Sequence, residues 1–132
     1  PICKKLMKKT ITTDNAPAAI GTYSQAVQHG GLLYVSGQIP LVPATMELVS
    51  SDIDQQINQV FDNLSAIAAA AGTTLNDAVK LTVYLTDLGH FSSVNEVMSQ
   101  RLAQPYPARV ALEVSALPRS ALVEIDAIVA IS

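Results

Sequence analysis

The sequence has 132 residues and a mass of 13.9 kDa, which is the size of a single domain. Eight Lys and Arg residues against eleven Asp and Glu give a formal net charge of -3, which disfavours nucleic acid as a partner because its phosphates attract basic surfaces. No apolar run reaches the roughly 18 residues of a membrane-spanning helix, so we expect a soluble protein. Because only 14% of the residues are charged and 49% are hydrophobic, we expect part of the surface to pack against other subunits.

The first nine residues form a short basic segment that lacks the apolar stretch of a secretory signal. We interpret residues 1–9 as an N-terminal extension, with Met7 as a candidate native start, and residues 10–132 as one domain. Cys3 is the single cysteine of the sequence, so neither an intrachain disulfide nor a cysteine-based metal cluster is expected. These features fit a reducing cytoplasm.

The first half of the chain predicts strands at residues 10–13, 26–28 and 32–36. The last two are separated by His29, Gly30 and Gly31, where paired glycines favour a tight hairpin. A loop follows over residues 41–50.

Residues 51–72 carry the clearest helix signal. Ser51 is the expected N-cap, with Asp54 three residues on, and Gly72 is the expected end. The apolar residues between them recur at spacings of three and four, which is typical of a helix with one buried face. They are Ile53, Ile57, Val60, Phe61, Leu64, Ile67 and Ala68.

The second half predicts another helix and three strands. Residues 78–86 alternate between apolar and polar, as in a strand with one buried face. Asp87 is the expected cap of a helix that Pro105 must stop, and strands follow at residues 108–114 and 122–131. The order β-β-β-α-β-α-β-β predicts an α+β, two-layer sandwich in which two helices cover one face of a mixed sheet. We expect the open faces to pack together in a closed cyclic oligomer.

Arg109 is the strongest candidate for ligand binding. It alternates with Val110 in a predicted strand, which holds its side chain rigidly on the face that also carries Ala111. A guanidinium matches a carboxylate bidentately, so this position suits a small organic acid. An ion pair with Glu113 or Glu124 explains the residue equally well.

Other polar residues have both a chemical and a structural interpretation. Glu124 interrupts an apolar run, where burial would raise its pKa and suit it to handling a proton or a water, although an exposed or paired carboxylate is commoner. Tyr23 is a possible hydrogen-bond donor or a packed ring. The Ser36-Gly37 pair would allow a ligand close to the backbone, or form a bulge. His29 and His90 lack neighbouring metal ligands, so no metal is expected.

Six separated motifs resemble the Rid family, the YjgF-like reactive intermediate deaminases. They are APAAIGTYSQAV at 16–27, SGQIP at 36–40, VYLTDL at 83–88, VN at 94–95, PAR at 107–109 and VEI at 123–125.

The resemblance implies a chorismate-mutase-like fold, a homotrimer with clefts between subunits, and a deaminase that needs no cofactor. The implied activity is that of a 2-iminobutanoate/2-iminopropanoate deaminase, which hydrolyses imines and enamines such as 2-aminoacrylate to 2-keto acids and ammonia. Arg109 would bind the substrate carboxylate, Glu124 would position the attacking water, and Tyr23 would assist them. The other implied pocket residues are Ser36, Gly37, Asn95 and Ala111.

The sequence departs from the family pattern at three places. Thr22 replaces a usual proline, Ala111 stands where many members carry cysteine, and the link from Asn95 to Arg109 is a few residues short. A module that binds 2-keto acids without catalysis therefore stays an alternative. Ribonuclease activity is disfavoured by the net charge and by the lack of a histidine pair for acid-base cleavage.

Overall fold

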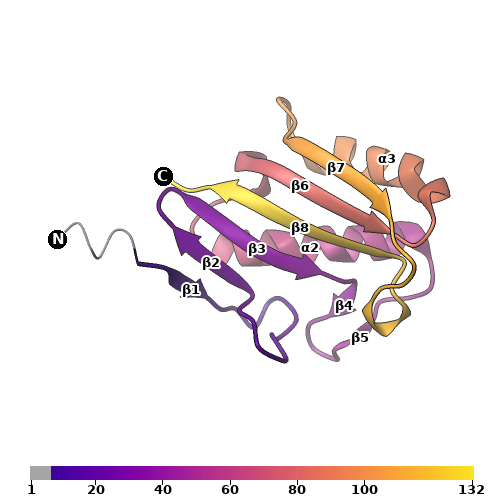
Figure 1. Cartoon of the computed structure of the whole chain (residues 1–132), viewed down its shortest axis with the longest axis horizontal. Helices are drawn as coiled ribbons and strands as arrows, with labels where there is room; N and C mark the ends of the chain where they lie inside the picture. Colours follow the sequence, from indigo (N-terminus) through magenta and orange to yellow (C-terminus); the bar gives the residue numbers. More distant parts are fainter. Residues whose placement is uncertain (1–6) are drawn as a thin grey trace.

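The computed structural model describes residues 7–132, which form a sheet covered by helices on one face (Figure 1). Within these residues a six-stranded sheet has the order β1-β2-β3-β8-β6-β7. Its members are β1 (Lys9–Ile11), β2 (Ala26–His29), β3 (Leu32–Gln38), β6 (Ala78–Leu85), β7 (Ala108–Glu113) and β8 (Val123–Ala130). The pair β6–β7 is parallel and the other pairs are antiparallel, so the expected mixed sheet and α+β class are confirmed.

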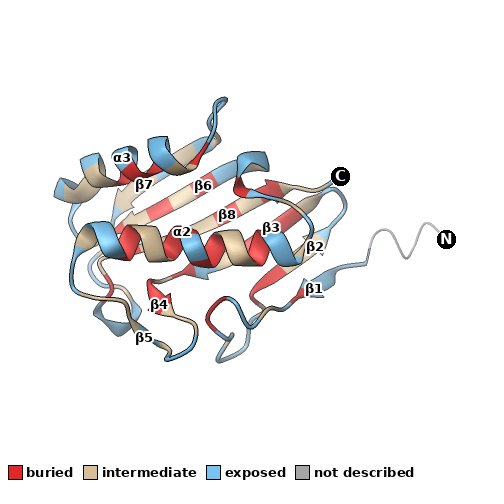
Figure 2. Cartoon of the chain, turned by 180° about the vertical axis from the view of Figure 1, so that it is seen from behind, coloured by how far each residue is buried: buried red, intermediate tan, exposed pale blue. Residues whose placement is uncertain are grey.

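The principal helix α2 (Ile53–Ala70) lies across the sheet, and its predicted apolar stripe faces the strands (Figure 2). Phe61, Leu64 and Ile67 are completely buried there. The predicted cap was wrong by one residue, because the Asp52 carboxylate, not Ser51, accepts the Gln55 N–H at 3.0 Å. After the helix, Gly72 has a φ of +80°, a conformation that favours glycine.

The second helix α3 (Phe91–Arg101) packs beside α2 on the same face of the sheet. Asp87 does not cap it directly, because its carboxylate caps the short 3-10 turn η2 (Leu88–His90) that precedes α3. Further 3-10 turns are η1 (Leu75–Asp77) and η3 (Pro118–Ser120). The predicted loop at residues 41–50 contains a small hairpin of β4 (Leu41–Val42) and β5 (Glu47–Leu48), whose strands are too short to show alternation.

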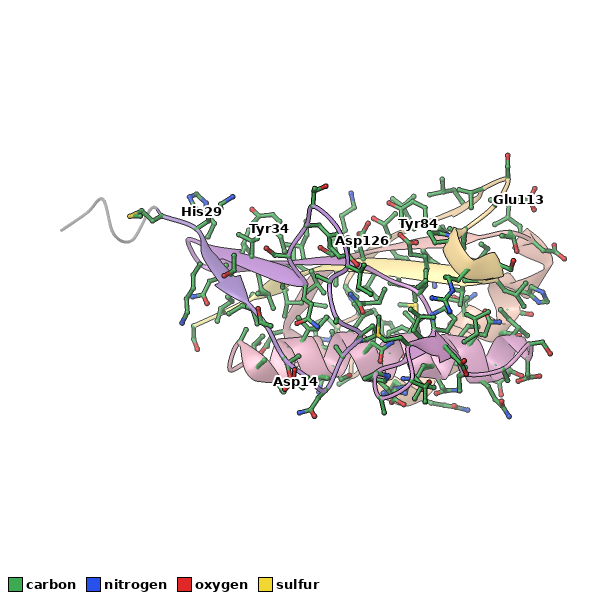
Figure 3. All side chains as sticks on the ribbon, turned by 90° about the horizontal axis from the view of Figure 1, so that it is seen from below. Asp14, His29, Tyr34, Tyr84, Glu113 and Asp126 are labelled. Carbon is green, nitrogen blue, oxygen red and sulfur yellow. The ribbon has the colours of Figure 1, made fainter. Side chains whose placement is uncertain are left out.

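The opposite face of the sheet carries no helix in the described chain. Tyr34, Tyr84 and Asp126 stand on this open face, away from α2 (Figure 3). Tyr34 and Val110 remain 44% exposed each. No helix within residues 7–132 is long and apolar enough to cross a lipid bilayer.

Buried amides tie the loops to the layers. Gln56, only 1% exposed, donates to the Ser50 carbonyl at 2.8 Å and accepts the Leu122 N–H at 2.9 Å. It thereby joins the start of α2 to the segment that enters β8. Asn63 donates similarly to the Leu41 carbonyl at 3.0 Å.

Replacing Gln56 with leucine should therefore lower the free energy of unfolding by about 2 kcal/mol, because two backbone groups lose their partner at similar side-chain volume. Urea titration would measure the change. The exposed neighbour Gln55→Leu, which leaves those two bonds intact, is the matched control and should stay within about 0.5 kcal/mol of the parent. Equal stability of the two variants would contradict the role given to Gln56.

Candidate functional site

Arg109 lies on the helix-facing side of the sheet, at its β7 edge. In the parallel pairing of β6 and β7, Arg109 is opposite Leu81 and Ala111 is opposite Val83. Leu81 and Val83 are completely buried under the helices, and paired residues of neighbouring strands share a face. The predicted alternation thus holds, and it directs Arg109 toward α3.

Three side chains of α3 hold the guanidinium in place. Its Nη1 donates to the Asn95 Oδ1 at 2.5 Å and approaches the Met98 sulfur at 3.5 Å. Its carbon stands 4.7 Å from the centroid of the Phe91 ring, a cation–π contact. Nε and Nη2 have no hydrogen-bond partner among the described residues, so this edge of the guanidinium can donate two hydrogen bonds to a carboxylate.

The alternative ion pairs of Arg109 do not form in the described chain. The Glu113 carboxylate instead accepts the Leu88 N–H at 3.0 Å, which ties η2 to the end of β7. Within residues 7–132 the one salt bridge joins Arg101 to Asp62.

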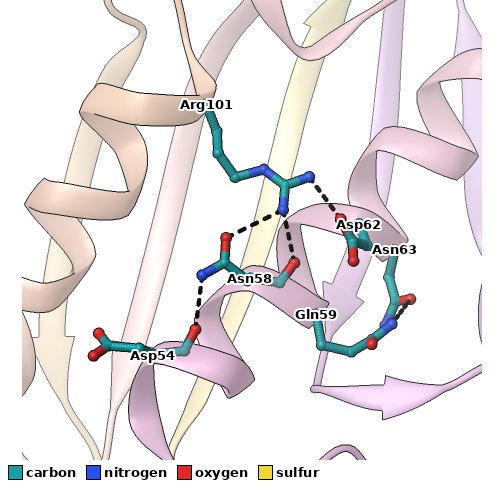
Figure 4. Close-up of polar contacts among 6 residues, drawn as sticks. All are labelled: Asp54, Asn58, Gln59, Asp62, Asn63 and Arg101. Carbon is teal, nitrogen blue, oxygen red and sulfur yellow. Dashed lines mark hydrogen bonds and ion pairs between the residues drawn. The ribbon is translucent and has the colours of Figure 1, made fainter.

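Arg101 anchors α3 to α2 (Figure 4). Its Nη2 lies 2.8 Å from the Asp62 carboxylate, and its Nη1 donates to the Asn58 carbonyl at 3.0 Å. The guanidinium carbon also stands 5.7 Å from the centroid of the Phe61 ring. Because α3 carries the residues that hold Arg109, this contact between the helices supports the guanidinium indirectly.

Two surface hollows meet at Arg109. One, of about 340 Å³, is bordered by Asn95, Met98 and Tyr106. The other is bordered by Leu88, Phe91 and Ala111, and apart from Arg109 its walls are apolar. We call Asn95, Arg109 and Ala111 the Arg109 half-site.

Glu124 occupies the opposite face of the sheet. It is paired with Tyr84 in the register of β6 and β8, while its neighbours Val123 and Ile125 point into the core. Gly37 lies against its carboxylate so closely that a Cβ there would collide with Oε2. Burial, and to a lesser degree the charge of Asp126, raises the pKa of the Glu124 carboxyl.

Tyr84 and Asp126 are neighbours of Glu124 that the sequence analysis missed. The Tyr84 hydroxyl donates to the Asp126 Oδ2 at 3.0 Å. Burial, this hydrogen bond and the nearby negative charges together raise the pKa of the phenol. The signal was available, because Glu124 and Asp126 are two residues apart in one strand and must share a face.

Tyr23, in the loop before β2, and Ser36, near the end of β3, border the Glu124 region. The Ser36 hydroxyl donates to the Ser24 carbonyl at 2.5 Å, and Tyr23, 53% exposed, lines a third hollow together with Gly37. We call Tyr23, Ser36, Gly37 and Glu124 the Glu124 half-site. The two half-sites therefore lie on opposite faces of the same sheet.

Metal binding finds no support in the described residues. No group of three or more His, Cys, Asp and Glu side chains gathers anywhere in residues 7–132. Cys3 falls outside this range.

Because the pKa of Glu124 is raised, we expect its ionisation to lower the free energy of unfolding. The folded protein binds the proton more tightly than the unfolded chain, so stability falls as pH rises above about 4, the ordinary pKa of a glutamate, through the folded-state value. Glu124→Gln, which cannot ionise, should raise the melting temperature at pH 7 by roughly 1–3 °C. The gain should vanish near pH 3.5.

Thermal unfolding at the two pH values tests this expectation. Glu96→Gln makes the same change at an exposed position of α3 and should show no such pH-dependent gain. A Glu124→Gln protein that melts below the parent at pH 7 would mean that the carboxylate is stabilising.

Known proteins match this chain over nearly its full length. The family model described as endoribonuclease L-PSP matches residues 13–131. The chain is 45% identical to the 2-iminobutanoate/2-iminopropanoate deaminase of Mus musculus, over 93% of this chain and 91% of the mouse protein.

Solved structures show the same fold. The crystal structure of RidA from an Antarctic Psychrobacter has a TM-score of 0.90 at 53% identity, covering 93% of this chain and 99% of that one. The structure of TdcF from E. coli with bound serine has a TM-score of 0.87 at 39% identity, covering 94% and 99%.

Proposed function

This chain belongs to the Rid family, and we propose that it is a cytoplasmic deaminase that hydrolyses small 2-imino acids and their enamine forms without a cofactor. Its substrates would include 2-aminoacrylate, and its products would be a 2-keto acid and ammonia. The observation that carries the proposal is the pair of half-sites: an Arg109 fork with one open edge, and a Glu124 carboxyl whose pKa is raised by burial. The name of the mouse relative supports the same reaction class.

In the proposed mechanism, Arg109 binds the substrate carboxylate through Nε and Nη2 and thereby orients the adjacent imine carbon. Glu124 holds a water and accepts one of its protons as the oxygen bonds to that carbon. The carbinolamine formed has a tetrahedral carbon that carries both hydroxyl and amine. The imine reacts with its nitrogen protonated, so this carbinolamine is neutral. Glu124 then returns its proton to the nitrogen, the C–N bond breaks, and the hydroxyl proton passes to the departing ammonia. One protonated imine and one water thereby give the 2-keto acid and ammonium.

The remaining half-site residues would support these two groups. Asn95 fixes the guanidinium by accepting from Nη1, which leaves the open edge for substrate. Gly37 leaves room for the Glu124 carboxylate, and the Tyr23 hydroxyl would donate to the substrate or to the water. Ala111 would contribute its backbone and a small wall beside Arg109.

We further propose that each complete site forms between two subunits of a homotrimer. One chain cannot bring Arg109 and Glu124 together, because the sheet itself separates them. A second copy that packs on the open face would supply the missing half. The low charged fraction and the exposed Tyr34 and Val110 of that face favour such packing.

A binding module for small carboxylates is the second candidate, because the Arg109 half-site by itself suffices to hold an acid. The relative with bound serine shows that a protein of this fold binds a small carboxylate. Ribonuclease action, which the description of the family model suggests, is less favoured by the net charge of -3.

The deaminase proposal predicts faster ammonia release when a dehydratase generates 2-aminoacrylate in the presence of the protein. Arg109→Ala should lower kcat/KM by about two orders of magnitude or more, since two charge-assisted hydrogen bonds of roughly 1.5–3 kcal/mol each are lost. Arg109→Lys should recover part of the loss because it keeps the charge but not the planar fork. Rates equal to the uncatalysed background would favour the binding module instead.

The trimer proposal predicts complementation between two inactive variants. If each cleft takes Arg109 from one subunit and Glu124 from its neighbour, random mixing of Arg109→Ala and Glu124→Gln subunits leaves about a quarter of the clefts with both native groups. Activity should then recover to about a quarter of the wild-type value after subunit exchange.

Each variant passed through the same exchange alone is the control, and light scattering should report about three times 13.9 kDa throughout. A mixture that stays as inactive as its components would mean that Arg109 and Glu124 of different subunits do not share a cleft.

A further inference from the structure

The hollow beside Tyr23 is built differently from the two at Arg109. It measures about 260 Å³ and is walled by segments that are distant in the sequence: the loop before β2, the end of β3, the β4–β5 hairpin and η3. Most of its wall is apolar, with Pro17, Ile39 and Leu41 among the contributors, and its lining holds one charged side chain, that of Arg119. An apolar hollow with a few convergent polar groups is the usual form of a small-molecule site.

The polar groups of this hollow divide into those already engaged and those available. The buried Gln25 donates to the Pro17 carbonyl at 2.8 Å and accepts the Thr13 N–H at 2.7 Å, so its amide holds the loop. Gln38 donates to the Ser36 carbonyl at 3.2 Å. Tyr23 and Arg119 have no side-chain hydrogen bond or ion pair within the described chain.

Arg119, whose side chain is exposed, lines the hollow from a segment with an unusual backbone. Its φ and ψ are 60° and 24°, and Ser120 follows with a φ of 58°. Met46, which also lines the hollow, has a φ of 60°. Left-handed conformations of residues other than glycine cost energy and concentrate at functional sites. Met46 and Arg119 both line this hollow, which indicates that the rest of the fold maintains the backbone shape of its wall.

Gly37 connects this hollow to the proposed chemistry. It lines the hollow and also contacts the Glu124 carboxylate. Glu124 itself does not line the hollow, so a substrate whose reacting carbon lies beside Glu124 would extend its side chain past Gly37 to enter it. The far end of the substrate side chain would then meet the Arg119 guanidinium, and the lining holds no acidic side chain that would compete for it.

We propose that Arg119 makes this hollow a specificity site for 2-imino acids whose side chain ends in a second carboxylate. The inference rests on the proposed function, and it adds the substrate class. Arg109 of one subunit would bind the carboxylate next to the imine, and Arg119 beside Tyr23 would bind the distal one. Apolar walls between them match the methylene groups of such a side chain.

The test compares two imines made in the assay by amino-acid oxidases, one from 2-aminobutyrate and one from glutamate, with semicarbazide to trap the imine that escapes. Arg119→Gln should lower kcat/KM for the dicarboxylic imine about tenfold, the value of one charge-assisted hydrogen bond. The monocarboxylic imine should change less than twofold. Arg119→Gly should show the same loss with the dicarboxylic imine. This variant adds no backbone strain, because glycine readily adopts a φ of 60°.

Lys9→Gln, which removes the same charge at the exposed start of β1, is the matched control and should leave the ratio of the two rates unchanged. A ratio unaltered in Arg119→Gln, or an equal loss with both imines, would overturn the inference. If the wild-type protein hydrolyses neither imine, the proposed function fails, and calorimetry with 2-ketobutyrate and 2-ketoglutarate decides about Arg119 by itself. Weaker binding of 2-ketoglutarate alone in the variant would support the specificity site, and unchanged binding would refute it.

Discussion

The alternation of side chains across paired strands is the constraint on which the candidate site depends. β6 is paired on both sides, parallel to β7 and antiparallel to β8, so its register sets the facing of both neighbours. Leu81 faces the helices, and so does its partner Arg109. Tyr84 faces away from the helices, and so does its partner Glu124. A shift of one residue in either pairing would reverse the face of every side chain in that strand, and in β8 it would expose the buried Val123 and Ile125. The separation of the two half-sites is thus as firmly set as the core.

The helices stabilise one half-site and leave the other open. α2 and α3 are joined by the contacts of Arg101 with Asn58 and Asp62, and α3 holds the Arg109 guanidinium through Asn95 and Phe91. The Arg109 half-site is therefore rigid in a single chain. The Glu124 half-site depends on Gly37 and on a loop that is tied down by the Gln25 amide.

The Glu124 region also shows how a site trades stability for chemistry. Its carboxyl is partly buried, close to the Asp126 carboxylate and against the backbone of Gly37, and these surroundings favour its protonated form. A carboxyl with a raised pKa is a stronger base when it is ionised, and it keeps its proton up to a higher pH. The same surroundings make its charge unfavourable for folding, so chemistry and stability oppose each other at one side chain.

Much of this protein follows from the sequence alone. Apolar periodicity located α2 and the alternating strand β6, and alternation placed Arg109 and Ala111 on one face, because these patterns depend on neighbours close in the chain. Short-range signals failed where two competing caps lay side by side, at Ser51 and Asp52, and where strands of two residues show no period. Only the tertiary structure decided which face of the sheet the helices cover, and hence that Arg109 and Glu124 lie on opposite sides of it. It also brought Arg119 to the hollow beside Tyr23 and Gly37. These placements rest on pairings between residues far apart in the chain, whose register and partner are set by packing of the whole core and not by any local pattern.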